Sequence, residues 1–345
     1  MAHVYLTDTT LRDGNHTVSH SFSPEEAAKI AKALEEAGID LIEVGHGDGI
    51  GGSTINYGHS KYPDKDVVKA VSKVLTKSKL TVLLLPGIGL VEDLHEMKEL
   101  GVKAVRIATH VTEADISHQH IKAAKEMGFF VVGFLMMAHM APTEKVVEEA
   151  LKMESYGADV VYVTDSAGAL LPAQVTERVS ALRKALKCAI GHHSHNNLGL
   201  AVANSLAAVE AGATYIDGSL SGLGAGAGNT STELVIAAFA KSGIETNADL
   251  FKAMDASKDV LIPILEQKGL HIHSNLDPMI LGYAGVYSSF LLHARRNAKT
   301  YGLDVRDILI ELGRRKAVGG QEDWIIEICN DLVKAKGQKT AKGDL

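Results

Sequence analysis

The chain has 345 residues, of which 46% are hydrophobic and 22% charged, and its formal net charge is −7. That net charge, with no run of basic residues, argues against a nucleic-acid-binding surface. The longest apolar run, residues 129–138, is far shorter than the ~20 residues of a membrane-spanning helix, and two cysteines exclude a disulfide framework. The N-terminus lacks the basic and apolar regions of a signal peptide, so we expect a soluble, cytoplasmic protein.

One pattern recurs along the chain: an amphipathic helical segment, a glycine, and a short run of aliphatic and β-branched residues. The glycines stand where helix C-caps are expected, because glycine adopts the left-handed conformation without strain. The apolar runs alternate little with polar residues, which is typical of strands buried on both faces. The pattern predicts eight strands, which begin near His3, Asp40, Lys79, Ala104, Phe129, Asp159, Cys188 and Tyr215.

Eight strand–helix units over residues 1–265 predict a (β/α)8 TIM barrel. The alternative is a doubly wound sheet, which usually starts with a strand, a GxGxxG loop and a helix. Residues 47–52 match that spacing, but no helical pattern follows them, so they do not support the alternative. Residues 270–337 carry helical patterns without strands and predict a helical C-terminal domain, and residues 338–345 predict a flexible tail.

Titratable residues gather at the predicted carboxyl ends of the strands, where barrels of this kind carry their chemistry. Lysines instead precede strands, at the opposite end, which argues against a Schiff-base aldolase. The eighth strand is followed by the glycine-rich loop "GLGAGAGN", and the earlier strand ends carry Asp8, Arg12, Asp13, His16, Glu43, His46, Asp48, His110, His139, Asp165, Ser166, His193 and His195.

His193 and His195 stand two residues apart at the end of the seventh strand, so their side chains project to the same face. They are either a metal-binding pair or two core or solvated histidines. The first strand lies only one strand away in a closed barrel, so Asp13 is placed to add a carboxylate. Two imidazoles and one carboxylate suit Mn²⁺, Mg²⁺, Co²⁺ or Zn²⁺, and ligand type does not choose among them.

Arg12 and His16 flank that carboxylate in the sequence. Arg12 is a candidate to stabilise an oxyanion, and it is also a candidate for a structural ion pair with Glu43. His16 is a candidate general base, because imidazole titrates near neutral pH. The alternative for His16 is a histidine in a surface loop.

The segments "TLRDGNH", "GHHSHNN" and "GLGAGAGN" resemble the metal-dependent pyruvate aldolases and HMG-CoA lyase-like barrels. Within this superfamily, "EVGHGDGIGGSTINYG", "LLLPGIG", "RIATHVTEAD", "GFLMMAHM", "LGYAGVYSSFLLHA" and "VGGQED" are similar to the 4-hydroxy-2-oxovalerate aldolase family. The resemblance covers nearly the whole chain. It implies divalent-metal-dependent retro-aldol cleavage of 4-hydroxy-2-oxopentanoate to pyruvate and acetaldehyde.

The resemblance also implies roles for single residues. Asp13, His193 and His195 would hold the metal, usually Mn²⁺ in this family. Arg12 would steady the enolate and His16 would be the catalytic base. The expected substrate-binding residues are Arg12, Asp13, Ser166, His193 and Tyr287, the last of them supplied by the C-terminal domain.

Three further expectations follow. HMG-CoA lyases carry a cysteine in the glycine-rich loop, and its absence here counts against acyl-CoA cleavage; Asn196, where relatives often have a third histidine, should point off the metal face.

The alternative enzyme is a synthase of the isopropylmalate or homocitrate type, which condenses acetyl-CoA with a 2-oxo acid, and the alternative outside catalysis is a scaffold. The resemblance implies a complex with an acylating acetaldehyde dehydrogenase through the helical C-terminal domain.

Overall fold

The computed structural model describes residues 3–272, 280–281, 283–284, 286, 289–317 and 321–343. It divides into two compact units, residues 1–272 and 273–345. The division falls close to the boundary expected between residues 265 and 270. Among the described residues, no helix combines the length and apolar character needed to cross a membrane.

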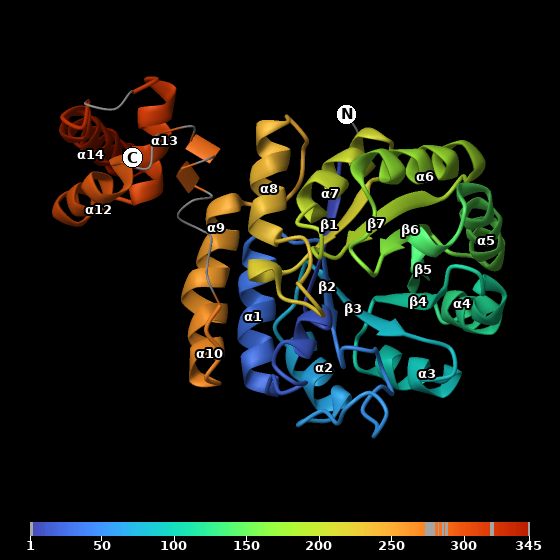
Figure 1. The fold of residues 1–345 in the computed structure, drawn as a ribbon. Helices are drawn as coiled ribbons and strands as arrows, with labels where there is room; N and C mark the ends of the chain where they lie inside the picture. The colour runs from blue at the N-terminus through green and yellow to red at the C-terminus, as the bar shows by residue number, and fades with distance from the viewer. Residues whose placement is uncertain are drawn as a thin grey trace. The chain divides into compact units, whose positions relative to one another are not determined.

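The first unit is a closed barrel of eight parallel strands in sequence order, so the predicted TIM barrel is confirmed and the doubly wound alternative is wrong (Figure 1). Every strand forms within two residues of its predicted start, and most of its residues are buried, as expected for strands covered on both faces. The strands are β1 (Tyr5–Leu11), β2 (Leu41–Val44), β3 (Lys79–Leu84), β4 (Ala104–His110), β5 (Phe130–Met136), β6 (Val160–Asp165), β7 (Ala189–Ser194) and β8 (Tyr215–Gly218).

A ring of helices covers the strands. Their ends follow local chemistry: Ser23 and Glu26 form a capping box at the start of α1, and Gly157 closes α5 in the left-handed conformation. The helices are α1 (Pro24–Glu36), α2 (Asp64–Ser72), α3 (Val91–Glu99), α4 (His118–Glu126), α5 (Thr143–Tyr156), α6 (Pro172–Ala185), α7 (Ala201–Glu210) and α8 (Thr232–Lys241).

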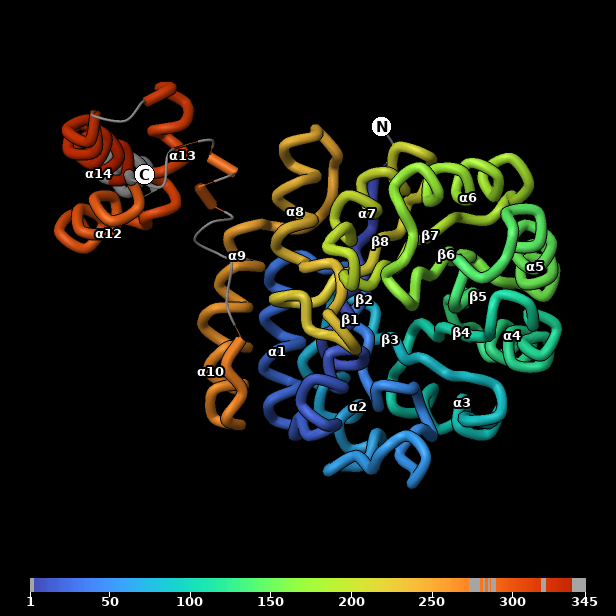
Figure 2. The backbone as a smooth tube through the Cα atoms, viewed as in Figure 1, coloured from blue at the N-terminus to red at the C-terminus, as the bar shows by residue number. Residues whose placement is uncertain are grey.

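After the barrel closes, a helical rod packs along α1, as Figure 2 shows. It consists of α9 (Leu250–Asp255), a π-helical turn (Ala256–Leu261) and α10 (Ile262–Gln267). The pairing of β8 with β1 and the interlocking of apolar side chains inside the barrel fix the strand ends in space. That inner core includes Leu83, Ala108, Val132, Phe134, Val160 and Tyr162.

The described part of the second unit is helical, with α12 (Ser289–Tyr301), α13 (Val305–Arg314) and α14 (Trp324–Gly343). Helix α14 continues through residues 338–343, within the segment 338–345 for which a flexible tail is expected. Both cysteines of the chain are unpaired.

Candidate active site

The end of β1 and a single 3-10 turn, Asp13–His16, form one wall of the candidate site. The turn begins where Asn15 donates its backbone N–H to Arg12, and the Asn15 amide is tied to the carbonyl of Gly45 at 2.9 Å. Residues three apart share a face in such a turn, which leaves Nε2 of His16 3.8 Å from Oδ1 of Asp13. Arg12 and Asp13 are buried, while the side chain of His16 is 28% exposed.

The end of β7 forms the opposite wall. His193 Nε2 lies 4.0 Å from Oδ2 of Asp13, and His195 Nε2 lies 3.6 Å from the same oxygen. His192, the residue before His193, alternates to the other face of β7, where its Nδ1 bonds the carbonyl of Val163. The expected convergence of the two imidazoles on Asp13 is therefore present.

The two histidines also present the correct nitrogen for a metal. His193 Nδ1 is bonded to Asp217 at 2.8 Å, and His195 Nδ1 faces the carbonyl of Ala225 at 3.4 Å. A neutral imidazole whose Nδ1 carries the proton keeps its lone pair on Nε2. Burial, together with His193, lowers the pKa of His195 to about 4, which keeps this imidazole neutral at pH 7. One atom from each of Asp13, His193 and His195 lies within 4.8 Å of the others, so this donor set fits a divalent cation.

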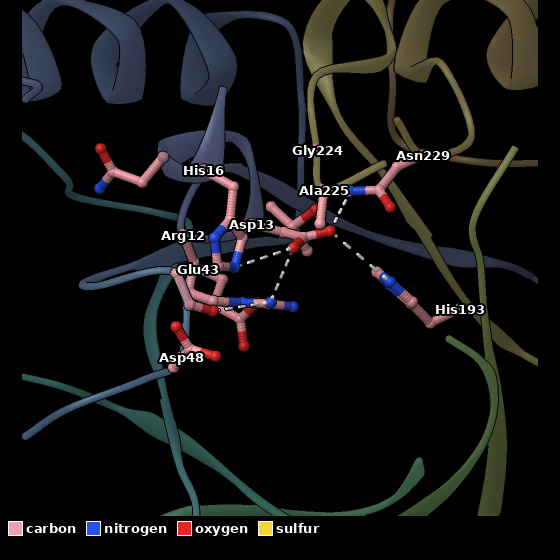
Figure 3. A network of polar contacts seen from close by, with 12 residues as sticks. Arg12, Asp13, His16, Glu43, Asp48, His193, Gly224, Ala225 and Asn229 are labelled. Atoms are coloured by element: carbon pink, nitrogen blue, oxygen red, sulfur yellow. Dashed lines mark hydrogen bonds and ion pairs between the residues drawn. The ribbon is translucent and has the colours of Figure 1, made fainter. Parts of the chain in front are cut away.

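Arg12 joins the site to β2. Its Nε donates to Oε2 of Glu43 at 2.7 Å, and its Nη1 lies 3.3 Å from Oδ1 of Asp13 (Figure 3). The expected ion pair with Glu43 is therefore present, and the same guanidinium also faces Asp13. Burial by itself would raise the pKa of Asp13, but Arg12, the two histidines and the Asn229 amide outweigh it and lower that pKa. Asp13 is thus ionised at neutral pH.

The glycine-rich loop after β8 also contacts Asp13. The Asn229 amide donates to Oδ2 of Asp13, and Figure 3 shows it approaching from the side opposite to His16. A side chain at Gly224 would collide with Asn229, since a Cβ there would lie 2.5 Å from Nδ2. Asn196 lies before α7, and its Oδ1 accepts the N–H of Ala201, the first residue of that helix.

Among the described residues, the other predicted side chains do not belong to the three-residue donor set. Ser166 follows β6, and its Oγ accepts the N–H of Met137 at 3.1 Å, a residue held at a positive φ of 58°. Tyr287 lies outside the described residues. His110 bonds Thr112, and His139 is not part of the cluster.

His46 belongs to a second cluster, with His16, His20 and Asp48. The rings of His46 and His20 stack with their centroids 3.8 Å apart, and atoms of His16, His20 and Asp48 lie within 4.8 Å of one another.

Sequence reasoning missed three residues that complete the site: Arg106, Asp217 and Asn229. Asp217 stands near the end of β8 on the inner face, and Arg106 is a lone charge inside the apolar strand β4. A buried charge in a barrel strand needs partners, and that signal was available in the sequence. Nothing in the sequence pattern, however, indicates that the partner of Arg106 lies on a strand four positions away.

The barrel and its donor cluster agree with comparisons to known proteins. A model described as HMGL-like matches residues 3–260, and one described as a DmpG-like communication domain matches residues 272–334. The chain is 57% identical over 335 residues to a 4-hydroxy-2-oxovalerate aldolase of Carboxydothermus hydrogenoformans, which covers 97% of this chain and 99% of the relative. It is 55% identical over 340 residues to one of Geobacillus thermodenitrificans, with 99% and 98% covered.

Two solved structures share the fold. The HMG-CoA lyase of Bacillus subtilis gives a TM-score of 0.66 at 21% identity, covering 79% of this chain and 96% of that one. The carboxyl transferase domain of Rhizobium etli pyruvate carboxylase gives 0.68 at 17% identity, with 96% and 61% covered. Fold and site thus define an HMGL-like barrel. Within that class, the chain belongs to the 4-hydroxy-2-oxovalerate aldolase family.

Proposed function

We propose that the chain cleaves 4-hydroxy-2-oxopentanoate to pyruvate and acetaldehyde by a retro-aldol reaction. One observation carries the proposal: Asp13, His193 and His195 converge beside Arg12 at the strand ends, in a chain that matches aldolases over almost its whole length. The reaction breaks a carbon–carbon bond without oxidation or reduction, so the enzyme is a lyase.

Asp13, His193 and His195 would hold a divalent cation, which we propose is Mn²⁺, with Mg²⁺ and Co²⁺ as alternatives. When bound, the cation supplies a Lewis acid for the carboxylate and 2-oxo oxygens of the substrate. The lone pairs on Nε2 and the charge on Asp13 support this assignment.

Arg12 and His16 divide the remaining chemistry. His16, the more exposed of the two, takes the proton of the C4 hydroxyl, and C4 becomes the carbonyl of acetaldehyde. The electron pair of the C3–C4 bond passes to the C2 oxygen, where the guanidinium of Arg12, oriented by Glu43, stabilises the enolate. Protonation of C3 then gives pyruvate. Ser166 and Tyr287 are proposed substrate contacts.

The first experiment measures pyruvate release from 4-hydroxy-2-oxopentanoate by metal-stripped protein, with and without added Mn²⁺. Pyruvate that depends on Mn²⁺ is the expected result. A second assay supplies acetyl-CoA and a 2-oxo acid and follows free thiol. Thiol release without aldolase activity would transfer the chain to the synthase class, and inactivity in both assays would contradict an enzymatic role.

We also propose that the helical C-terminal domain docks an acylating acetaldehyde dehydrogenase, which would consume the aldehyde, and that the protein is cytoplasmic. The match of residues 272–334 to a communication domain supports a docking role. Size-exclusion chromatography of the two co-expressed proteins tests it. A shared peak is expected, and two independent peaks at micromolar concentration would contradict it.

A further inference from the structure

One buried arginine links the wall of the site formed by the end of β1 to the wall formed by the end of β7. Arg106, on β4, is buried to 1% exposure, and its guanidinium lies over the rings of Phe134 at 4.2 Å and Tyr162 at 4.7 Å. Neither aromatic ring offers a countercharge. The charge is instead balanced by two carboxylates, Glu43 on β2 and Asp217 on β8.

Each of these carboxylates uses one oxygen to contact two side chains. Glu43 Oε2 accepts Arg12 Nε at 2.7 Å and lies 3.3 Å from Arg106 Nη1. Asp217 Oδ2 accepts a hydrogen bond from Arg106 Nη2 and bonds His193 Nδ1 at 2.8 Å. A continuous buried chain therefore runs Arg12–Glu43–Arg106–Asp217–His193.

We infer that Arg106 is a positioning residue for the proposed aldolase reaction, which fixes the enolate-stabilising Arg12 and the metal-ligating His193 at the same time. The planar guanidinium presents Nη1 and Nη2 to different carboxylates, and its stacking on Phe134 and Tyr162 sets the plane of the fork. Because Arg106 touches neither the metal ligands nor Arg12 directly, it acts only through Glu43 and Asp217. The expected effect of Arg106 on kcat rests on the proposed function.

The principal test replaces Arg106 by lysine, which keeps the charge and loses the fork. A point charge can serve one carboxylate in good geometry. We expect kcat to fall about 10-fold or more with KM little changed, and the Kd for Mn²⁺ to rise about 10-fold, the usual cost of losing an outer-shell partner. Calorimetric titration with Mn²⁺ alone measures the second quantity without any turnover.

Variants of the two carboxylates that flank Arg106 separate the effect on kcat from the effect on Mn²⁺ affinity. Glu43→Gln should lower kcat and leave the Mn²⁺ Kd within about twofold, whereas Asp217→Asn should raise that Kd by about 10-fold or more. Lys125→Met is the matched control, since it also removes a cation paired with a carboxylate, Asp159, but at the opposite end of the barrel. It should leave both quantities unchanged. A folded Arg106→Lys enzyme that behaves like this control would overturn the inference.

A double-mutant cycle protects the test against misfolding of the arginine variant. Glu43 and Asp217 are linked through Arg106, so the combined variant should deviate from the sum of the single effects on kcat or on Mn²⁺ Kd. Strict additivity would overturn the inference. If wild-type protein releases no pyruvate but binds Mn²⁺, the proposed function fails, and the Mn²⁺ affinities still decide whether Arg106 positions His193.

Discussion

Two histidine clusters lie at the same end of the barrel, and they use their imidazoles in opposite ways. In the metal-ligand cluster, His193 and His195 use Nδ1 toward protein acceptors and direct Nε2 at Asp13. In the second cluster, His20 Nδ1 accepts the N–H of Gly47 and His46 Nδ1 accepts the N–H of Asp48. His46 Nε2 also faces the carbonyl of Gly58 at 3.1 Å.

The comparison shows that proximity of histidines does not define a metal site. Atoms of His16, His20 and Asp48 also lie within 4.8 Å of one another, as close as those of the metal-ligand cluster. A neutral imidazole has one lone pair, however, and when Nδ1 accepts a backbone N–H, Nε2 carries the proton. His20 therefore has no lone pair left for a metal. The hydrogen-bond partner of Nδ1 therefore decides whether Nε2 of a histidine is free to bind a metal.

The largest expected effect comes from exchanging one carboxylate in each cluster. Asp13→Asn should abolish measurable Mn²⁺ binding and pyruvate release, because it removes the charge that two imidazoles and Arg12 surround. Asp48→Asn, the same change in the second cluster, should leave the Mn²⁺ Kd within about twofold. Calorimetry on both variants measures this. If Asp48→Asn instead lost Mn²⁺ binding and Asp13→Asn kept it, the metal would belong to the second cluster and the assignment to Asp13 would be contradicted.

The next effect separates charge from geometry at Arg12. Arg12→Ala should lower kcat about 10³-fold, the usual cost of losing an oxyanion donor, and Arg12→Lys should recover part of it. Lysine keeps the charge but cannot hold Glu43 through Nε while facing Asp13. Steady-state kinetics at saturating Mn²⁺ measures both variants. Unchanged kcat in either would remove Arg12 from the mechanism.

The sequence predicted the barrel well, because the fold depends on local signals that one chain displays. Most strands contain a short apolar run such as residues 160–163, and some helix ends carry a glycine or a side-chain cap, as α5 and α1 do. The convergence of Asp13 with His193 and His195 was also predictable, since strand order and two-residue alternation place them. Asn196 followed the same alternation.

Contacts that depend on side-chain conformation were beyond the sequence. The pairing of Arg106 with Asp217 spans the barrel interior, and the use of Asn229 to hold Asp13 depends on the path of a glycine-rich loop. The nitrogen that each histidine presents is set by a neighbouring carbonyl or N–H, such as that of Gly47 for His20. Such choices follow from packing and not from residue order.

The third prediction tests whether His16 acts as the catalytic base. His16→Ala should lower kcat about 10²-fold near neutral pH, with partial recovery at high pH, where hydroxide replaces the missing base. Mn²⁺ affinity should stay near the wild-type value, because Nε2 of His16 is 3.8 Å from Asp13 and not in the donor set. A ratio of wild-type to variant activity that is flat across pH would count against the role as base.

The smallest expected effect concerns stability and is tested at His20, in the second cluster. Partial burial, with His46 and His16 as neighbours and Asp48 opposing them, lowers the pKa of His20 from 6.5 to about 4. Between these values the unfolded chain binds a proton that the folded one does not, so folding is favoured above pH 6.5 and this contribution is lost as the pH falls toward 4.

His20→Leu should therefore flatten the fall in unfolding free energy between pH 6.5 and 4. The change in slope should be smaller than the ~1.4 kcal/mol per pH unit of one full proton, because solvent screens a side chain that is only partly buried. Urea unfolding at several pH values measures it, and His95→Leu, on the exposed part of α3, is the control. Equal slopes in the two variants would mean that the surroundings of His20 do not hold this imidazole neutral.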